Sequence, residues 1–131
     1  IDVGGRRAEA VALLNSGFES EGPDVAVPVE VARELEVYPP PEGTKLEEVE
    51  TAGGMSHVYV IGSPAHISLL AGGRELRRVR CNILVSPYID EVLLSDYLID
   101  ELGIRVVSFR RGLWRHESDP EGVVRESEAR G

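Results

Sequence analysis

Apolar and polar residues alternate along most of this chain in the way that short β-strands separated by turns do. Alternating or continuous apolar runs predict strands at 7–14, 45–51, 55–61, 66–70, 75–85 and 104–109, with a further short apolar segment at 90–94. Glycine pairs at 53–54 and 72–73 separate neighbouring runs, which predicts two β-hairpins. The stretch 18–27 is rich in Ser, Gly, Glu and Pro and is predicted to be a loop.

Two short helices interrupt these strands. Pro28 can occupy the first turn of a helix, and apolar residues recur after it at helical spacing to about Glu36. A second helix is predicted from Asp96 to Leu102, with Ser95 as its N-cap and Gly103 at its C-terminal end. Strands joined mostly as hairpins indicate a mainly β fold, a closed or nearly closed barrel with one or two short helices, and not an alternating βαβ fold.

The length of 131 residues suits one domain with its own core. We expect this domain to span 1–115. The remaining residues, 116–131, are polar and show little periodicity, so we expect them to form a loosely ordered tail.

The charge balance narrows the range of partners. The formal net charge is −9, which disfavours nucleic acid and anionic membrane surfaces, because both require a basic face. No apolar run approaches the roughly 20 residues of a membrane span. We therefore expect a cytoplasmic protein that binds neither nucleic acid nor membrane.

Cysteine and histidine usage argues against a metal or cofactor. Cys81 is a single cysteine, so the chain can form no internal disulfide, and its position in an apolar run suits a strand residue. The three histidines, His57, His66 and His116, lack the close spacing of a metal cluster. We expect neither a metal nor a cofactor.

The most informative segment is the apolar run Val11–Leu14, which stops at the small polar triplet Asn15-Ser16-Gly17. Such a run delivers a polar group from a buried strand to a tight turn. Taken alone, Asn-Ser-Gly is also a common turn tripeptide. A similar pattern recurs where Leu93 and Leu94 enter Ser95 and Asp96.

On these residues the chain resembles the retropepsin-like aspartic proteases, the small homodimeric relatives of retroviral protease, and in particular their short prokaryotic and archaeal-type members. The segment Leu13–Phe18 is similar to the apolar-apolar-Asp-Thr/Ser-Gly signature of the family. Thr51–Gly54 is similar to the glycine-rich tip of its flap hairpin, and Leu93–Asp96 to the apolar motif before its C-terminal helix. Pro28–Leu35 is similar to the short helix often found after the signature.

The resemblance implies a site shared by two subunits. Each subunit would contribute one Asp on a two-fold axis, and the two carboxylates would activate one water. In this chain Asn15 stands at the position of the catalytic Asp, and Ser95 replaces the usual Gly of the second motif. The resemblance gives Ser16 a supporting role between the two loops, while Gly17 would permit the tight turn.

The resemblance also implies a peptide-binding flap. Ala52, Gly53, Gly54 and Met55 would contact an extended peptide or an unfolded protein substrate, with the glycines allowing the tip to move. The functional expectation is a homodimeric aspartic endopeptidase with no cofactor.

Asn15 limits this expectation. An amide has nearly the shape of a carboxylate but cannot ionise, so it cannot be the general base. The chain as written is therefore predicted to be inactive or nearly so. Two alternatives stay open: a natural pseudo-protease that binds peptides without cleaving them, and a β-barrel in which the triplet is only a turn. Whether Asn15 is natural or an introduced inactivation is open as well.

Overall fold

In the computed structural model, the described residues are 1–14, 18–40, 42, 44–51 and 54–127. The expected site residues at positions 15–17, 52 and 53 therefore lie outside them. The described residues form strands and helices in the order β1 (Asp2–Val3), β2 (Arg6–Arg7), β3 (Ala12–Leu13), β4 (Asp24–Val27), α1 (Val29–Glu34), β5 (Lys45–Thr51), β6 (Gly54–Ala71), β7 (Arg74–Val85), β8 (Val92–Leu94), α2 (Asp96–Glu101), β9 (Ile104–Ser108), β10 (Leu113–His116) and β11 (Arg125–Glu126).

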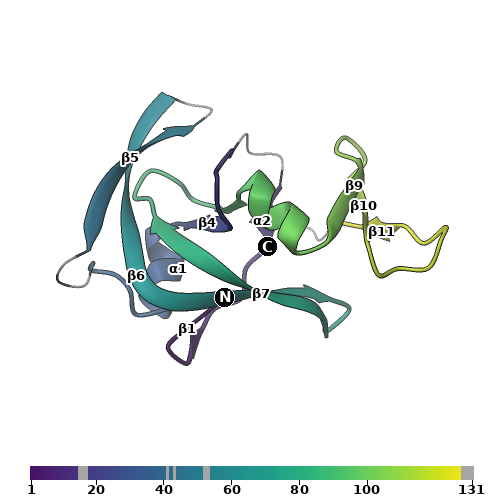
Figure 1. Ribbon diagram of the computed structural model, residues 1–131, viewed down its shortest axis with the longest axis horizontal. Helices are drawn as coiled ribbons and strands as arrows, with labels where there is room; N and C mark the ends of the chain where they lie inside the picture. Colours follow the sequence, from purple (N-terminus) through teal and green to yellow (C-terminus); the bar gives the residue numbers. More distant parts are fainter. Residues whose placement is uncertain (15–17, 41, 43, 52–53, 128–131) are drawn as a thin grey trace.

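Most strands belong to one curled sheet, in the order β2-β1-β6-β7-β4-β8-β3, with β5 added to β6 (Figure 1). A mainly β fold is thus confirmed. Among the described residues, however, the end strands β2 and β3 do not pair with each other. The sheet is therefore a half-barrel, and the expectation of a closed barrel is wrong for this single chain.

The long strand β6 connects the two hairpins of the sheet. The sequence predicted separate strands at 55–61 and 66–70, but the structure joins them into one strand of 18 residues. Its register against β7 shifts between Ile61 and Ala65, at the Gly62-Ser63-Pro64 segment. Gly62 and Pro64 lie at this register shift, where the regular pairing with β7 is interrupted. Glycine and proline are tolerated at such a position, so the strand can bend there without ending.

Both predicted hairpins are present. β6 and β7 turn at Gly72 and Gly73, whose φ angles of +58° and +76° suit the two-residue turn that hairpins favour. β5 and β6 pair from Lys45 opposite Val60 to Thr51 opposite Gly54. Leu46, an apolar residue of the strand predicted at 45–51, is 57% exposed, because β5 extends away from the core as one side of a projecting hairpin (Figure 1).

The N-terminal third departs most from the sequence prediction. The expected strand at 7–14 is broken into β2 and β3, since the amide of Ala8 bonds to the carbonyl oxygen of Ile1 (3.0 Å). The predicted loop at 18–27 ends in strand β4, whose Val25 and Val27 are fully buried. Four residues are too few for an alternation to show against a polar, glycine-containing background.

The helices agree with their sequence signals. α1 follows Pro28, and α2 follows Ser95, whose side chain accepts a hydrogen bond from the amide of Leu98. Gly103 ends α2 with a φ of +78°, as its predicted C-terminal position requires. The core lies between the helices and the concave side of the sheet, with the fully or almost fully buried residues Val25, Val27, Ala32, Leu35, Ala65, Ile83, Val85, Leu98 and Leu102 at its centre.

A second, three-stranded sheet in the order β11-β10-β9 follows α2 (Figure 1). The sequence predicted a loosely ordered tail from His116, and the structure differs there. His116 is fully buried, and its Nε2 donates to the carbonyl oxygen of Leu102 (2.8 Å). Farther along, Arg125 forms two hydrogen bonds to the carboxylate of Asp119 (2.7 and 2.8 Å), which lower the pKa of that carboxyl. These contacts order residues that composition alone marks as polar tail.

Candidate functional site

The two apolar segments that precede the polar turns singled out in the sequence lie side by side in the fold. β3 and β8 pair in parallel, with Ala12 opposite Val92 and Leu13 opposite Leu93. Both strands therefore point the same way and end at the same edge of the sheet. Ser95 follows the end of β8, and Leu14 precedes the undescribed residues 15–17 after β3.

The connection between β3 and β4 crosses the end of β8. β8 lies between these two strands, parallel to β3 and antiparallel to β4. The chain that leaves β3 must therefore pass over the C-terminal end of β8 before β4 begins. Backbone hydrogen bonds fix the crossing: the Asp96 amide donates to the carbonyl oxygen of Phe18 (3.0 Å), and the Ser95 amide donates to that of Asp24 (2.9 Å).

Ser95 is the central contact of this crossing. Its side chain is fully buried, and its hydroxyl oxygen accepts from the amides of Leu98 and Asp24, both at 3.1 Å. The same hydroxyl donates to the carbonyl oxygen of Gly22 (3.1 Å). Ser95 thus caps α2 and holds the β3–β4 connection in place. The sequence predicted the cap but not the bonds to residues 71 and 73 positions away.

We expect the Ser95→Ala variant to lose about 2–4 kcal/mol of unfolding free energy. About 1 kcal/mol comes from the lost helix cap, the bond to the amide of Leu98, and the rest from losing the hydroxyl's bonds to the amide of Asp24 and the carbonyl oxygen of Gly22. Urea denaturation measures the loss. Ser63→Ala is the control, because Ser63 is exposed on β6. Equal midpoints for the two variants would contradict the role given to Ser95.

Two polar side chains that the sequence did not indicate also hold the crossing. Asp24 accepts from the side-chain amide of Asn82 (2.9 Å) and from the hydroxyl of Ser20. The Ser20 amide in turn donates to the carboxylate of Asp96 (3.2 Å). Ser20 and Asp24 have no recognisable motif, since their partners lie on β7 and α2, far along the chain. Asp96 was expected to act as a first-turn helix residue, and it occupies that position.

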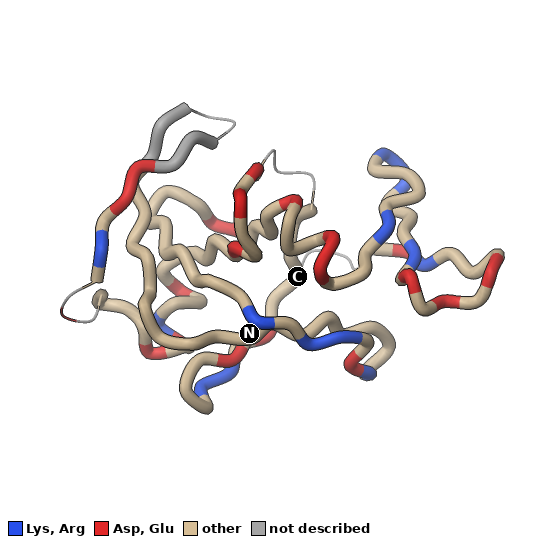
Figure 2. The backbone as a smooth tube through the Cα atoms, viewed as in Figure 1, with Lys and Arg blue, Asp and Glu red and all other residues tan. Residues whose placement is uncertain are grey.

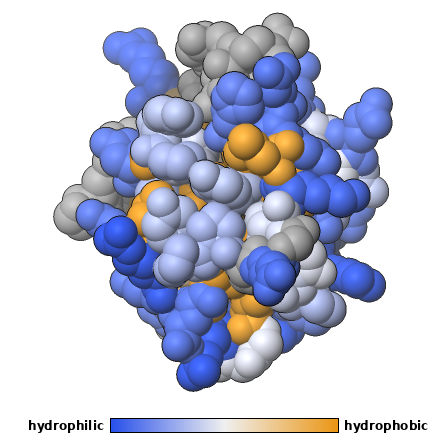
Figure 3. All heavy atoms as spheres, turned by 90° about the vertical axis from the view of Figure 1, so that its left-hand side faces the viewer, coloured by the Kyte–Doolittle hydropathy of each residue, from blue (hydrophilic) through white to orange (hydrophobic). Residues whose placement is uncertain are grey.

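The expected flap residues are only partly described. Ala52 and Gly53 lie outside the described residues, whereas Gly54 and Met55 begin β6 and pair with Thr51 and Glu50. Lys45, Glu47 and Glu48 on the facing strand are exposed. Seen from the β5 side, the molecule is mostly hydrophilic with small separate apolar patches (Figure 3). The hairpin therefore has the form of a polar arm carried by the sheet.

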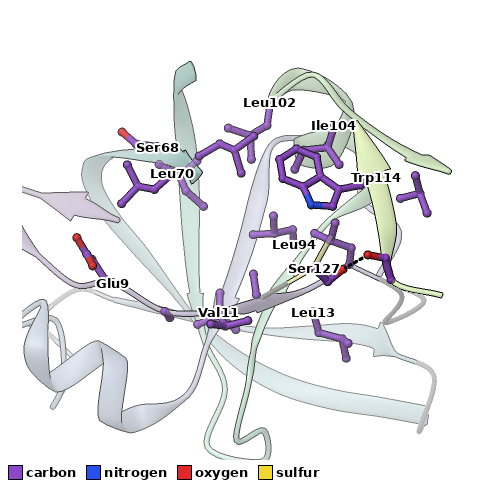
Figure 4. A pocket seen from close by; sticks show the side chains of 18 of the residues that line it. Glu9, Val11, Leu13, Ser68, Leu70, Leu94, Leu102, Ile104, Trp114 and Ser127 are labelled. Carbon is purple, nitrogen blue, oxygen red and sulfur yellow. Dashed lines mark hydrogen bonds between the residues drawn. The ribbon is translucent and has the colours of Figure 1, made fainter. Parts of the chain in front are cut away.

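A large groove begins where β3 ends. It encloses about 1000 Å³ between the β6–β7 hairpin and the β9–β10 hairpin. Its walls are mainly apolar, with Leu94, Ile104 and Trp114 pointing into it (Figure 4). The sequence did not predict this groove, because its walls come from segments that are distant along the chain.

No helix among the described residues has the length and apolar character to cross a membrane. In the same part of the chain, no group of three or more His, Cys, Asp or Glu side chains is arranged to hold a metal ion. His57 lies 3.3 Å from a Glu48 oxygen on the exposed flap arm, and His116 is buried in the second sheet.

The residue that follows Leu14, at the start of the crossing connection, is an amide, Asn15. Comparison with known proteins found no matching family model, no matching curated protein and no matching solved structure.

Proposed function

We propose that this chain is one half of a homodimeric aspartic endopeptidase, with position 15 of each subunit contributing to a shared site. The observation that carries the proposal is the parallel pairing of Leu13 with Leu93, together with the crossing of the β3–β4 connection over the end of β8. This arrangement ends β3 next to the start of α2, where Ser95 also holds Gly22 and Asp24 by hydrogen bonds. A catalytic group needs such a fixed support.

The chemistry follows from two carboxylates at position 15. Carboxylates about 3 Å apart cannot both ionise near neutral pH, so they share one proton. The ionised oxygen would take a proton from the water that attacks the peptide carbonyl, while the protonated partner would donate to the carbonyl oxygen. The pair would titrate as a unit. Asn15 removes the base in both subunits, so the chain as written binds substrate without efficient cleavage.

The substrate would be an extended peptide or an unfolded protein. The β5–β6 arm is a regular hairpin that ends at Gly54, and a hairpin tip can offer backbone groups to an extended chain. Ala52–Met55 would make these contacts. A peptide-binding pseudo-protease is the second candidate function, and the amide at position 15 favours it.

The shared site is testable without catalysis, by disulfide formation. In the Asn15→Cys variant, two thiols that face each other across a two-fold axis should form an intersubunit disulfide on mild oxidation, because a disulfide requires Cα atoms within about 7 Å. Cys81 does not interfere, because its side chain is buried and burial raises the pKa of its thiol to about 11. Non-reducing electrophoresis should then show a covalent dimer.

Ser63→Cys is the matched control. Ser63 is exposed on β6 and makes none of the hydrogen bonds that hold the crossing. If Asn15→Cys gives no more covalent dimer than Ser63→Cys, positions 15 do not meet and the shared site is wrong.

A further inference from the structure

We propose that the apolar groove between the β6–β7 and β9–β10 hairpins is the surface on which a second copy of this chain docks, reciprocally across a two-fold axis. The inference rests on the proposed function in so far as that function needs a dimer, and it names the surface that makes the dimer. The groove begins at Leu13 and Leu14, directly before position 15. A partner seated there is adjacent to the candidate site.

The walls of the groove are mainly apolar and open to solvent. Leu94, Leu102 and Ile104 form its deeper, buried part, and the half-buried Val106 and Trp114 extend it toward the second sheet. Covering such side chains removes apolar area from water, at roughly 25 cal/mol per Å². Large open apolar hollows of this kind mark interaction sites on soluble proteins.

The same surface carries the group that fits the hollow. Phe109, at the turn between β9 and β10, is 60% exposed and borders the groove. β9, which leads into this turn, is an edge strand that pairs only with β10 among the described residues. A two-fold interface brings one patch against its own copy, so a patch with both a projection and a hollow is self-complementary.

Charged residues on the rim of the groove also favour a second copy of this chain as the partner. The β9–β10 turn carries the exposed Arg110 and Arg111, neither of which makes an ion pair with the residues that the structure describes (Figure 2). The opposite side carries Glu9 and Glu91, with Asp90 in an adjoining hollow.

Two further basic residues line the groove. Arg78 lies 3.9 Å from Asp2, and Arg7 is exposed beside Glu9 in the sequence. The side of the rim opposite the arginine turn thus carries both signs of charge, because Arg7 lies there with Glu9 and Glu91. A two-fold rotation that brings the arginine turn of one copy onto the carboxylates of that side of the other pairs opposite charges twice. This local attraction counters the repulsion between two chains that each carry a net charge of −9.

Charge reversal tests the proposed docking surface in the full chain, with Asn15 retained. The unmodified chain should sediment at twice the mass of one chain at high micromolar concentration. Arg110→Glu/Arg111→Glu should weaken the dimer by about 100-fold, because like charges then face each other. Glu9→Arg/Asp90→Arg should do the same. An equimolar mixture of the two variants should form a mixed dimer, because opposite charges face each other again.

The control variant is Lys45→Glu/Arg80→Glu. It changes the net charge by the same amount as Arg110→Glu/Arg111→Glu, but at exposed positions outside the groove. It should leave the dimer intact. A monomeric unmodified chain, dimers unaffected by both reversals, or a mixture that stays monomeric would each overturn the inference. Circular dichroism of every variant excludes unfolding as the cause.

The two proposals fail separately. If the charge variants behave as expected but Asn15→Asp shows no cleavage, the docking surface is supported and the protease function is wrong. If Asn15→Asp cleaves the substrate while the charge reversals leave the dimer unchanged, the protease function is supported and the dimer uses another surface.

Discussion

Replacing Asn15 with aspartate should raise kcat/KM for an unstructured protein substrate by at least about 10³-fold at mildly acid pH. A positioned general base contributes roughly 10²–10⁴ to the rate, and here the substitution also supplies the general acid in the second subunit. A 10³-fold gain corresponds to about 4 kcal/mol of transition-state stabilisation. The activity should fall on both sides of its optimum, because the paired carboxylates work only when they share one proton.

The strongest control for this prediction uses the expectation that each subunit contributes one carboxylate to the site. Adding an excess of the unmodified chain to Asn15→Asp should suppress cleavage, because exchanged dimers carry one aspartate and one amide. A site complete within one chain would be unaffected by the added protein. Asn15→Ala should remain as inactive as the unmodified chain, since it also lacks a carboxylate.

The cleavage assay and the disulfide experiment together separate the alternatives. A covalent Asn15→Cys dimer with no cleavage by Asn15→Asp would favour a natural pseudo-protease that binds peptides. Absence of both would favour a structural β fold in which the triplet is only a turn.

The elements that could be predicted from the sequence are those with local signals. The β6–β7 hairpin depends on Gly72 and Gly73, which adopt positive φ angles at little cost. α2 depends on Ser95 and Gly103, which satisfy its two ends. In each case the physical cause lies within a few residues of the element, so one short window of sequence contains the whole signal.

The missed elements have non-local causes. β4 is a strand because it fills the gap between β7 and β8, pairing with Ile83 on one side and Leu94 on the other. Nothing within 18–27 reveals those partners. The expected closure of the barrel failed for the same reason, since it depends on whether distant end strands meet, and β2 and β3 do not pair among the described residues.

The candidate site likewise has parts with local sequence signals and parts with non-local causes. The strand end before position 15 and the helix start at Ser95 could be predicted because an apolar run stops at each. Their neighbouring positions could be expected only through the family resemblance, because no short pattern encodes the parallel pairing of β3 with β8. The groove and its charged rim could not be predicted at all, since they are assembled from hairpins far apart along the chain.

The Gly103→Ala variant should lose about 2–5 kcal/mol of unfolding free energy. Gly103 joins α2 to β9 with a φ of +78°, where a side chain costs about 1–2 kcal/mol. An added methyl group would also lie 2.8 Å from the Nε2 of His116 and 2.8 Å from a guanidinium nitrogen of Arg77. Crowding of a packed interior adds about 1–3 kcal/mol. His116 cannot withdraw without giving up its bond to the carbonyl oxygen of Leu102.

Gly72→Ala separates backbone strain from crowding. Gly72 has a φ of +58°, similar to that of Gly103, but an added methyl group there would meet no atom within 4 Å. Both variants also restrict the unfolded chain by the same amount, so this contribution cancels in the comparison. Urea denaturation should therefore show a clearly larger loss for Gly103→Ala. Equal losses would mean that backbone strain alone sets the cost, and that the contact of His116 with the end of α2 is not tightly packed.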